Sequence, residues 1–393
     1  MSPDKPIIRV LMLNNEFPPL GGGTGSVNQA LMDRFAGLER FEIDLVTSAR
    51  GRKPEQVAYA DRIRIFKVPV NNQNIHHSTA RELSTYAWLG WRKASRLQRE
   101  RPYDLCMTWS TVPAGWIARR LWREHGLPYL VRITGPDIPG FEKRYRLLYP
   151  FLAPVIRRIW RDAHTVVVKC AGEAGMVKAV SPLIMPVTIQ NGVEMKAFTP
   201  SCPPQAGEPL RMVCVGRLVK RKGQDRLIAA VAELKALGVK VRLELVGAGD
   251  EEYAYRRLVE KEGLHDCIVF TGYVPREQIA QHYSKAHVFV LPSDNEGMSV
   301  STLEAMAAGL PLVVSRTCGT DELVDEGGNG VTFGSDDVNG LVLVLRRLAG
   351  DPDAVARMGR ASLEKARLFT WDHVTLAYTG LFENMPGLRS TMD

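Results

Sequence analysis

Short apolar runs alternate with segments of helical period along almost the whole chain. Such runs are typical of parallel strands buried on both faces, and their alternation with helices predicts an α/β fold. The pattern therefore predicts two doubly wound, Rossmann-like sheets. The predicted strands are Ile7–Leu13, Ile43–Thr47, Ile63–Val68, Leu105–Thr108, Tyr129–Ile133 and Thr165–Val168 in the first sheet, and Arg211–Gly216, Arg242–Val246, Cys267–Thr271, Val288–Leu291 and Leu312–Ser315 in the second.

A proline-rich segment separates the two series of strands. Thr199–Pro209 contains four prolines and no apolar period, which is typical of a linker. The length of 393 residues also favours two domains, because a single core stops growing at about 250–300 residues. We therefore predict domains over residues 1–198 and 210–368, followed by a helix at about 369–385. Ligands of doubly wound sheets bind beyond the carboxyl ends of the strands, so candidate residues are expected there.

A glycine-rich stretch follows the first predicted strand. Gly21–Ser26 precedes a helical pattern formed by Val27, Leu31 and Phe35. Such a turn lets backbone N–H groups approach a phosphate, and the dipole of the following helix favours negative charge. The stretch is no Walker loop, because no Gly-Lys-Ser/Thr follows it. A flexible loop ahead of a helix is the alternative.

Several cations follow the first strand of the second series. Gly216-Arg217-Leu218 is followed by Lys220, Arg221 and Lys222. Arginine offers a planar fork of donors and lysine a point charge, and both suit phosphate oxygens. The stretch therefore predicts a diphosphate site, with a solvated basic turn as the alternative.

Two glutamates lie further along the second series. Glu296 is in the loop after a predicted strand, and Glu304 is in the following helix. Residues eight apart on a helix differ by about 80° in direction, so both carboxylates can face one cleft. Carboxylates suit sugar and ribose hydroxyls, and the N–H groups near Met298–Val300 suit phosphate. A surface or capping role is the alternative for Glu304, and its apolar neighbours disfavour it. A fourth stretch, Ile189–Glu194, contains Asn-Gly, which alone indicates only a turn.

In this order, the motifs resemble those of glycosyltransferase family 4, whose members have the GT-B fold. The resemblance covers nearly the whole chain and departs at Gln190 and Glu194, where the family has proline and aspartate. The matching residues are Pro18-Pro19, Gly22-Gly23, Ile189–Glu194, Gly216–Leu218, Lys222–Gly223, Glu296, Glu304, Ala305–Gly309, Gly319 and Glu322.

The resemblance implies a retaining transferase with two Rossmann-like domains facing each other across a cleft and a C-terminal helix that crosses back to the first domain. The donor would be a nucleoside diphosphate sugar, commonly UDP-linked. Arg217 and Lys222 would hold the diphosphate and stabilise it as the leaving group, as a departing dianion requires. Glu304 would bind the ribose hydroxyls, and Glu296 would position the donor sugar. The implied donor site is Gly22, Gly23, Asn191, Gly216, Arg217, Lys222, Gly247, Val274, Glu296, Gly297, Met298, Ser299, Val300 and Glu304.

The acceptor side departs from the family pattern. Many members have His-Gly-x-Asp where this chain has Thr134-Gly135-Pro136-Asp137. We expect Asp137, with Thr134 as its hydrogen-bonding partner, to orient the acceptor hydroxyl or the donor sugar. A purely structural turn role for Asp137 is the alternative. The predicted catalytic residues are thus Asp137, Thr134, Arg217, Lys222 and Glu296.

The sequence predicts neither a metal site nor a bound cofactor. Asp351-Pro352-Asp353 looks like a metal-binding pair, but the end of one helix and the start of the next explain it better. The six cysteines include no C-x-x-C pair and no cluster with histidines. Hydrophobic residues make up 45% and charged residues 24%, so neither disorder nor a fibrous repeat is indicated.

The formal net charge of +8 favours anionic partners. Residues Arg81–Arg101 include six basic and two acidic residues around Trp88 and Trp91, and Glu142–Asp162 has the same balance. Basic amphipathic segments of this kind are typical of docking on anionic lipid, and ordinary core packing with a solvated basic face is the alternative. In the second segment the predicted apolar stripe, interrupted by Pro150 and Pro154, is Leu147, Leu148, Phe151, Leu152, Val155, Ile156, Ile159 and Trp160.

The expected partners are a nucleotide sugar and a glycan or lipid-linked acceptor. No nucleic-acid module is recognisable, and no membrane-spanning run or signal peptide is present, so a cytoplasmic enzyme is expected, with contact at the inner face of the membrane left open. Two alternatives remain. One is a sugar-nucleotide epimerase or hydrolase of the same fold, and the other is a non-catalytic partner in glycan biosynthesis.

Overall fold

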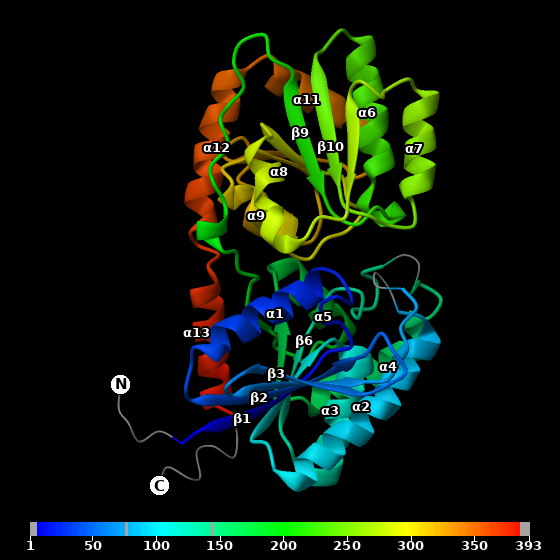
Figure 1. The fold of residues 1–393 in the computed structure, drawn as a ribbon, viewed down its shortest axis with the longest axis vertical. Coiled ribbons are helices and arrows are strands. Elements are labelled where there is room, and N and C mark those ends of the chain that lie inside the picture. The colour runs from blue at the N-terminus through cyan, green and yellow to red at the C-terminus, as the bar shows by residue number, and fades with distance from the viewer. Residues whose placement is uncertain (1–5, 75–77, 143–144, 386–393) are drawn as a thin grey trace. The chain divides into compact units, whose positions relative to one another are not determined.

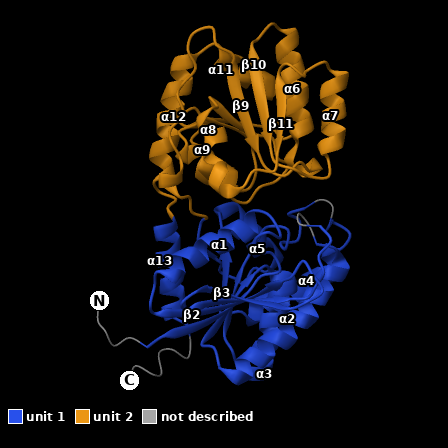
Figure 2. Cartoon of the chain, viewed as in Figure 1, with its two compact units in different colours: residues 1–190, 371–393 blue, residues 191–370 orange. Residues whose placement is uncertain are grey.

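The computed structural model of the protein describes residues 6–74, 78–142 and 145–385. These residues form two compact units (Figure 2). Unit 1 contains the chain up to Gln190 together with the part from Trp371 onward, and unit 2 contains Asn191–Thr370. The chain therefore passes between the units twice, and each unit has its own sheet.

Unit 1 is built on an eight-stranded sheet with the order β3-β4-β2-β1-β5-β6-β7-β8. Neighbouring strands are parallel, except that β3 runs antiparallel to β4 at one edge. The strands are β1 (Ile8–Leu13), β2 (Phe41–Ser48), β3 (Glu55–Ala60), β4 (Ile63–Val68), β5 (Leu105–Trp109), β6 (Tyr129–Arg132), β7 (Thr165–Val168) and β8 (Val187–Thr188).

Helices cover both faces of this sheet, because its central strands are apolar on both sides. Every residue of β5 is buried, and so is every residue of β1 except Arg9. Helices α2, α3 and α4 lie on one face, and α1 and α13 lie on the other (Figure 1). The helices of unit 1 are α1 (Gly23–Ala36), α2 (Ala80–Glu100), α3 (Trp116–His125), α4 (Tyr149–Asp162), α5 (Ala171–Val180) and α13 (Trp371–Glu383).

Unit 2 is built on a six-stranded, fully parallel sheet with the order β11-β10-β9-β12-β13-β14. Its strands are β9 (Leu210–Val215), β10 (Val241–Val246), β11 (Ile268–Gly272), β12 (Val288–Leu291), β13 (Leu312–Ser315) and β14 (Gly330–Phe333). Its helices are α6 (Gln224–Ala236), α7 (Glu252–Lys261), α8 (Ala280–Ser284), α9 (Val300–Ala307), α10 (Thr320–Leu323), α11 (Val338–Ala349) and α12 (Pro352–Ala366).

Local sequence signals set several helix ends. Thr79 and Glu82 form a reciprocal capping box at the start of α2, which satisfies two free N–H groups. Helix α3 ends at Gly126, whose φ of 72° is the left-handed conformation that glycine adopts easily. The carboxylate of Asp351 accepts from Ala354 N at 2.8 Å, so this aspartate caps α12.

The C-terminal helix α13 belongs to the core of unit 1. The ring of Phe382 lies 5.5 Å from that of Phe35 and 5.9 Å from that of Phe41, and Phe382 is fully buried. The buried guanidinium of Arg132 donates to the hydroxyl of Tyr378 and, at 3.2 Å, to Ile189 O. Helix α13 thus contributes both apolar packing and the partner of a buried cation.

The division between the units falls before the proline-rich segment, at Gln190 and Asn191. The physical reason is that the chain from Asn191 onward is already bonded into unit 2. The side-chain amide of Asn191 donates to Met298 O at 2.9 Å, and Ser201 N donates to Ala308 O at 2.9 Å. Residues 199–209 therefore run along unit 2.

Three strands and one helix start escape the apolar pattern. Strand β3 is an exposed edge strand, β8 has two residues, and β14 (Gly330–Phe333) is half-buried. Helix α1 begins at Gly23, within the predicted glycine-rich turn, so Gly23–Gly25 form its first turn.

The predicted apolar stripe of residues 142–162 is wrong at its beginning. Leu147, Leu148 and Phe151 are 79%, 52% and 80% exposed, whereas the buried side of α4 is formed by Ile156, Ile159 and Trp160. Helix α4 begins only at Tyr149, so Leu147 and Leu148 lie before it. Residues 143 and 144 of this segment lie outside the described residues. Among the helices that the structure describes, none is long and apolar enough to cross a bilayer.

Candidate functional site

Two loops meet at the carboxyl edge of the sheet of unit 2. The loop after β9 ends in a short 3-10 turn, Lys220–Lys222, and the loop after β12 carries Glu296. Lys222 Nζ lies 2.6 Å from Glu296 Oε1, and a guanidinium nitrogen of Arg221 lies 3.6 Å from the same oxygen. Asp294 N donates to Arg221 O at 2.8 Å and ties the loops together. The structure thus brings the predicted Lys222 and Glu296 into contact.

Burial and charge oppose each other at this ion pair. Burial alone would raise the pKa of Glu296, but the charges of Lys222 and Arg221 outweigh it and hold the pKa below its ordinary value. Burial lowers the pKa of Lys222, and the Glu296 charge offsets part of this effect. A recessed carboxylate between two cations is therefore ionised, and the site keeps an excess of positive charge that suits an anionic ligand.

Arg217 follows β9 after one glycine, Gly216, on a loop with a tightly fixed backbone. Gln224 Nε2 donates to Arg217 O at 3.0 Å, and Gly216 N donates to Val246 O at 2.9 Å. A Cβ on Gly247 would lie 2.1 Å from Gly216 O, and the φ of Gly247 is 136°, so this position requires glycine. The loops after β9 and β10 therefore pack backbone against backbone. Val274, predicted beside the nucleobase, is half-buried against the core of unit 2.

The start of α9 supplies amide donors beside the ion pair. Ser299 caps the helix, and its Oγ accepts from Thr302 N at 3.3 Å. Gly297 and Met298 precede this cap, and Val300 is the first helical residue. The buried Asn191 accounts for the position of this loop, because its side-chain amide donates to Met298 O. Asn191, predicted to contact the donor, holds Met298 in place.

Glu304 lies in the second turn of α9 and faces Tyr283 of α8. The buried Tyr283 hydroxyl donates to Glu304 Oε2 at 2.8 Å. Burial raises the pKa of Glu304 to about 7, although the hydrogen bond from Tyr283 and the charge of Arg276 act in the opposite direction. The helical spacing predicted for Glu296 and Glu304 does not apply, because Glu296 precedes the helix. Sequence reasoning placed Arg221 in the basic cluster but assigned no role to Arg276 or Tyr283, since nothing in the sequence tells which side chains meet a given carboxylate.

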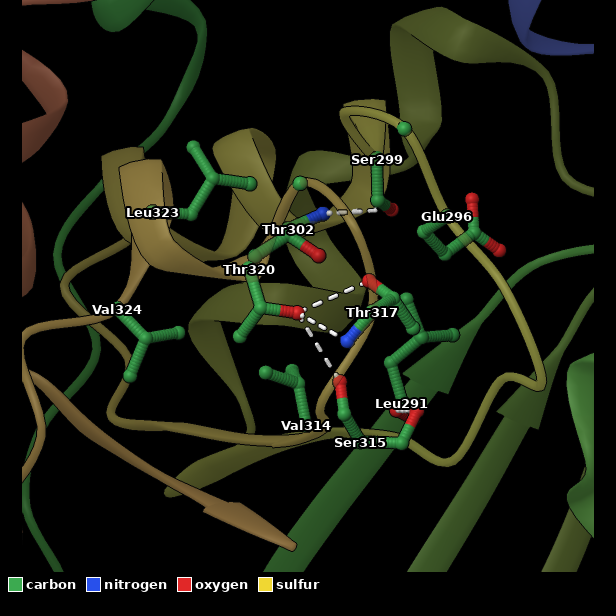
Figure 3. Close-up of a pocket in the computed structure, with 12 residues that line it drawn as sticks. Leu291, Glu296, Ser299, Thr302, Val314, Ser315, Thr317, Thr320, Leu323 and Val324 are labelled. Atoms are coloured by element: carbon green, nitrogen blue, oxygen red, sulfur yellow. Dashed lines mark hydrogen bonds between the residues drawn. The ribbon is translucent and has the colours of Figure 1, made fainter. Parts of the chain in front are cut away.

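A small pocket lies behind the Glu296 loop (Figure 3). Its cavity volume of about 20 Å³ has room for one water molecule and is too small for a sugar nucleotide. The Thr320 hydroxyl accepts from Thr317 N at 2.8 Å and donates to Ser315 O at 3.1 Å. In Figure 3 the carboxylate of Glu296 points away from these hydroxyls. The pocket therefore belongs to the support of the loop, whose backbone Glu296 O accepts from Gly319 N at 3.1 Å.

The predicted acceptor-side residues lie at the carboxyl edge of the sheet of unit 1. Asp137 Oδ1 accepts from Thr134 N and Gly135 N, both at 3.0 Å, and from Thr134 Oγ1 at 3.1 Å. Its other carboxylate oxygen accepts from Thr111 N at 2.6 Å. These four contacts bring Asp137 and Thr134 together as predicted. They also give Asp137 the turn-forming role that the sequence left open.

Ser110, at the end of β5, is a residue that sequence reasoning missed. Its φ is 108°, a region that residues other than glycine rarely adopt. Its backbone is fixed by Arg132 O and Gly115 N, and its buried hydroxyl has no hydrogen-bond partner among the described residues. The neighbouring Thr111 contacts Asp137, so this strained serine adjoins the Asp137 turn.

Gly22 and Gly23 lie at the start of α1 in unit 1. Gly22 is the cap residue of the helix, and Ser26 N donates to Gly22 O at 3.2 Å. The first turn of α1 carries no acidic side chain, so its amides are suited to an anion. Among the described residues, no group of three or more His, Cys, Asp or Glu side chains could hold a metal ion.

Comparisons with known proteins identify the family. The family model for group 1 glycosyl transferases matches residues 203–365, and the model for glycosyl transferase 4-like domains matches residues 22–181. The chain belongs to glycosyltransferase family 4. As a glycosyltransferase, it takes its sugar from a nucleotide sugar. The two models together cover both predicted Rossmann-like domains.

Similar proteins match this family 4 enzyme over most of its length. The GDP-mannose-dependent alpha-(1-6)-phosphatidylinositol monomannoside mannosyltransferase of Mycolicibacterium smegmatis is 26% identical over 368 residues, which cover 90% of this chain and 92% of the relative. Sucrose-phosphate synthase from Thermosynechococcus elongatus matches with a TM-score of 0.82 at 22% identity, covering 96% of this chain and 98% of that one. The Anabaena protein HepE, solved with UDP and glucose, matches with a TM-score of 0.73 at 19% identity, covering 96% and 100%. These solved structures show the GT-B fold of the chain.

Proposed function

We propose that this glycosyltransferase moves a sugar from a nucleoside diphosphate sugar to a hydroxyl group of a glycan or lipid-linked acceptor, with retention of configuration. The observation that carries the proposal is the set of Lys222, Arg221 and Glu296 next to the amides at the start of α9. Two cations and a helix N-terminus suit a diphosphate, and the remaining carboxylates suit hydroxyl groups. Burial of the cations strengthens their attraction for the leaving group.

In this proposal each residue has a defined task. Lys222 and Arg217 bind the diphosphate oxygens and stabilise their growing charge as the sugar–phosphate bond breaks. Glu296 holds Lys222 in place and faces the sugar hydroxyls, and Glu304 accepts from the ribose hydroxyls. The N–H groups of Gly297, Met298, Ser299 and Val300 bind further oxygens of the donor. Ser110 and the Asp137 turn form the acceptor side in unit 1.

The proposal leaves two candidates for the nucleoside of the donor, uridine and guanosine. The sequence resemblance favours UDP, whereas the mycolicibacterial relative is named for GDP-mannose. The same relative's name, with its phosphatidylinositol monomannoside, supports a lipid-linked acceptor. With a lipid acceptor, we infer a cytoplasmic enzyme that works at the inner face of the membrane, without a metal or bound cofactor.

A binding panel tests the donor site. The melting temperature of the protein is measured with UDP, GDP, UDP-sugars and GDP-mannose, since a ligand that binds the folded state raises it by mass action. We expect one nucleoside to stabilise the wild type and to lose this effect in Lys222→Met. Arg316→Met, which removes a cation of unit 2 outside the proposed site, is the matched control. If no nucleotide stabilises the protein, the donor assignment is wrong.

A product assay separates transfer from the two alternatives. The stabilising nucleotide sugar is incubated with and without a mixture of glycan and lipid acceptors. Release of nucleoside diphosphate that requires an acceptor supports transfer, and the anomeric configuration of the product reports retention. Epimerised sugar or release in water alone supports the epimerase or hydrolase. Binding with no turnover under any of these conditions supports the non-catalytic partner.

A further inference from the structure

The outward face of α4 in unit 1 differs from that of an ordinary covering helix. Phe151, Pro154 and Arg158 are all exposed and are spaced at i, i+3 and i+7 on the helix, so they form one stripe of α4. Leu147 and Leu148 lie in the turn just before α4 and are exposed as well. Single exposed apolar residues are normal, but three large ones within five positions form a patch that calls for a partner. We call the exposed residues Arg146, Leu147, Leu148, Phe151, Pro154, Arg157 and Arg158 the α4 patch.

The charges of this segment all have one sign. Between Tyr145 and Arg161 the chain has four arginines and no lysine, aspartate or glutamate. The nearest acid in sequence is Asp162, and it is engaged by Arg119 at 2.7 Å and by Arg161 at 3.0 Å. The α4 patch is therefore an apolar cluster with Arg146 before it and Arg157 and Arg158 after it. The rise of a helix places Arg158 about 10 Å beyond Phe151 along the axis.

The face of the sheet that carries α4 has further exposed residues of the same kinds. Helix α3 packs against both α2 and α4, and it exposes Trp122. Helix α2 exposes Trp88, and the guanidinium of Arg92 lies 4.7 Å from the centre of its ring. Trp91 has an internal explanation, because it donates to Glu124 at 3.0 Å and stacks under Arg120 at 3.5 Å. The α4 patch is therefore the place on this face where large exposed apolar side chains adjoin one another in sequence.

We propose that the α4 patch docks the protein on an anionic membrane surface. Leu147, Leu148 and Phe151 enter the boundary between headgroups and acyl chains, and Arg157 and Arg158 remain at the level of the lipid phosphates. Anionic lipid attracts the arginines, and burial of the leucine and phenylalanine side chains adds to the binding. The proposal deepens the proposed function, because it brings unit 1 to the surface where a lipid-linked acceptor lies.

Charge favours a membrane over a second copy of the chain. A two-fold contact through this face would enclose the arginines of both copies, and residues 145–161 supply no acidic side chain to offset them. Like charges placed together in an interface weaken it. A lipid surface supplies the opposite charge at every position and needs no shape complementarity.

Vesicle co-sedimentation of the full-length protein tests the docking surface. We expect binding to vesicles of phosphatidylcholine with phosphatidylglycerol, little binding to phosphatidylcholine alone, and weaker binding at high salt. Leu147→Ser combined with Phe151→Ser should lower the partition coefficient at least tenfold, since each side chain contributes about one order of magnitude or more. Arg146→Gln and Arg158→Gln should each lower it about fivefold.

Leu376→Ser is the matched control, because Leu376 is 70% exposed on α13 of the same unit. This variant should bind vesicles like the wild type. The proposal is overturned if the Leu147 and Phe151 double variant binds anionic vesicles as well as Leu376→Ser does. It is equally overturned if the wild type does not bind anionic vesicles, whether or not the double variant changes self-association or capture of an acidic protein. Vesicle binding needs no donor or turnover, so its outcome is independent of whether sugar transfer is found.

Discussion

Glu304 is a buried carboxyl group whose charge changes near neutral pH. Burial raises its pKa to about 7 in the ligand-free protein, so ribose binding through the carboxylate requires loss of a proton. We expect the affinity for the nucleotide sugar to rise about tenfold between pH 6 and pH 8, because the ionised fraction grows by about that factor. Calorimetric titration with the intact nucleotide sugar measures this, since its phosphate diesters do not titrate in that range.

The Glu304→Gln variant is the control for this pH dependence. It should bind the donor more weakly than the wild type at pH 8 and with little change between pH 6 and pH 8. Because Tyr283 donates to Glu304, the glutamine oxygen can still accept that hydrogen bond and keep the fold. A pH dependence of full size in Glu304→Gln would assign the titration to another group and remove Glu304 from the ribose site.

Asp137 shows how a residue with a catalytic pattern can have a structural task. Its two carboxylate oxygens accept four hydrogen bonds, three of them from backbone N–H groups. In Asp137→Asn one oxygen becomes an amide that cannot accept from Thr111 N. We expect the free energy of unfolding to fall by about 1–3 kcal/mol, as for a buried donor left without a partner. Thermal and denaturant unfolding measure this loss, and Thr134→Ala, which removes one contact, should cost less. An unchanged stability with lost turnover would instead make Asp137 a group that acts on the substrate.

At the scale of elements, α13 is a part of the core of unit 1 rather than an appendage. Phe382 is fully buried against Phe35 and Phe41. We expect Phe382→Ala to lower the free energy of unfolding of unit 1 by about 3–5 kcal/mol, through lost burial and the cavity left behind. Denaturant unfolding followed by circular dichroism measures this change. Leu376→Ser on the exposed side of the same helix should leave the transition where it is, and equal effects of the two variants would contradict the packing described here.

The loop between β12 and α9 depends on a close backbone approach from Gly319. A Cβ at Gly319 would lie 1.1 Å from Gly297 O, so alanine there must displace the loop that carries Glu296. We expect Gly319→Ala to weaken nucleotide binding at least tenfold, measured by calorimetry, since even small misplacements of binding groups are costly. Gly350→Ala is the matched control in unit 2, because its Cβ would meet only ordinary contacts at 3.6 Å or more. Normal nucleotide binding by Gly319→Ala would show that the loop position is not needed.

At the scale of the whole molecule, the sequence predicts the positions of buried strands and the residues that gather where those strands end. Parallel strands buried on both faces leave continuous apolar runs, so β4, β7, β12 and β13 could be predicted to the residue. The meeting of Lys222 with Glu296 was predictable, because both follow neighbouring strands whose carboxyl ends share one edge. The contacts of Arg221 with Glu296 and of Tyr283 with Glu304 were not, because they depend on loop geometry and on a second helix.

The predictions were wrong where a sequence pattern continues across the start of a helix or across the boundary between the units. The apolar period of residues 142–162 includes Leu147 and Leu148, but α4 begins at Tyr149. These two leucines therefore do not belong to a face of the helix. Asn191-Gly192 indicates only a turn, yet the bonds from Asn191 to Met298 make it the place where unit 2 begins. Prolines marked a linker at residues 199–209, although backbone bonds such as Ser201 N to Ala308 O hold that segment on unit 2.

The division into units leads to a prediction about where the nucleotide acts. The proposed diphosphate and ribose groups come from loops and helices of unit 2 alone, so a nucleoside diphosphate without its sugar should order that unit. Hydrogen exchange followed by mass spectrometry should show slower exchange at residues 216–223 and 296–300 when the nucleotide is added. Helix α12, capped by Asp351 in the same unit, should exchange at the same rate with and without nucleotide. Lys222→Met should abolish the protection of both loops together, because the ion pair with Glu296 couples them at 2.6 Å. Protection that survives in this variant, or that spreads evenly over unit 2, would mean that the nucleotide binds without the Lys222 and Glu296 pair.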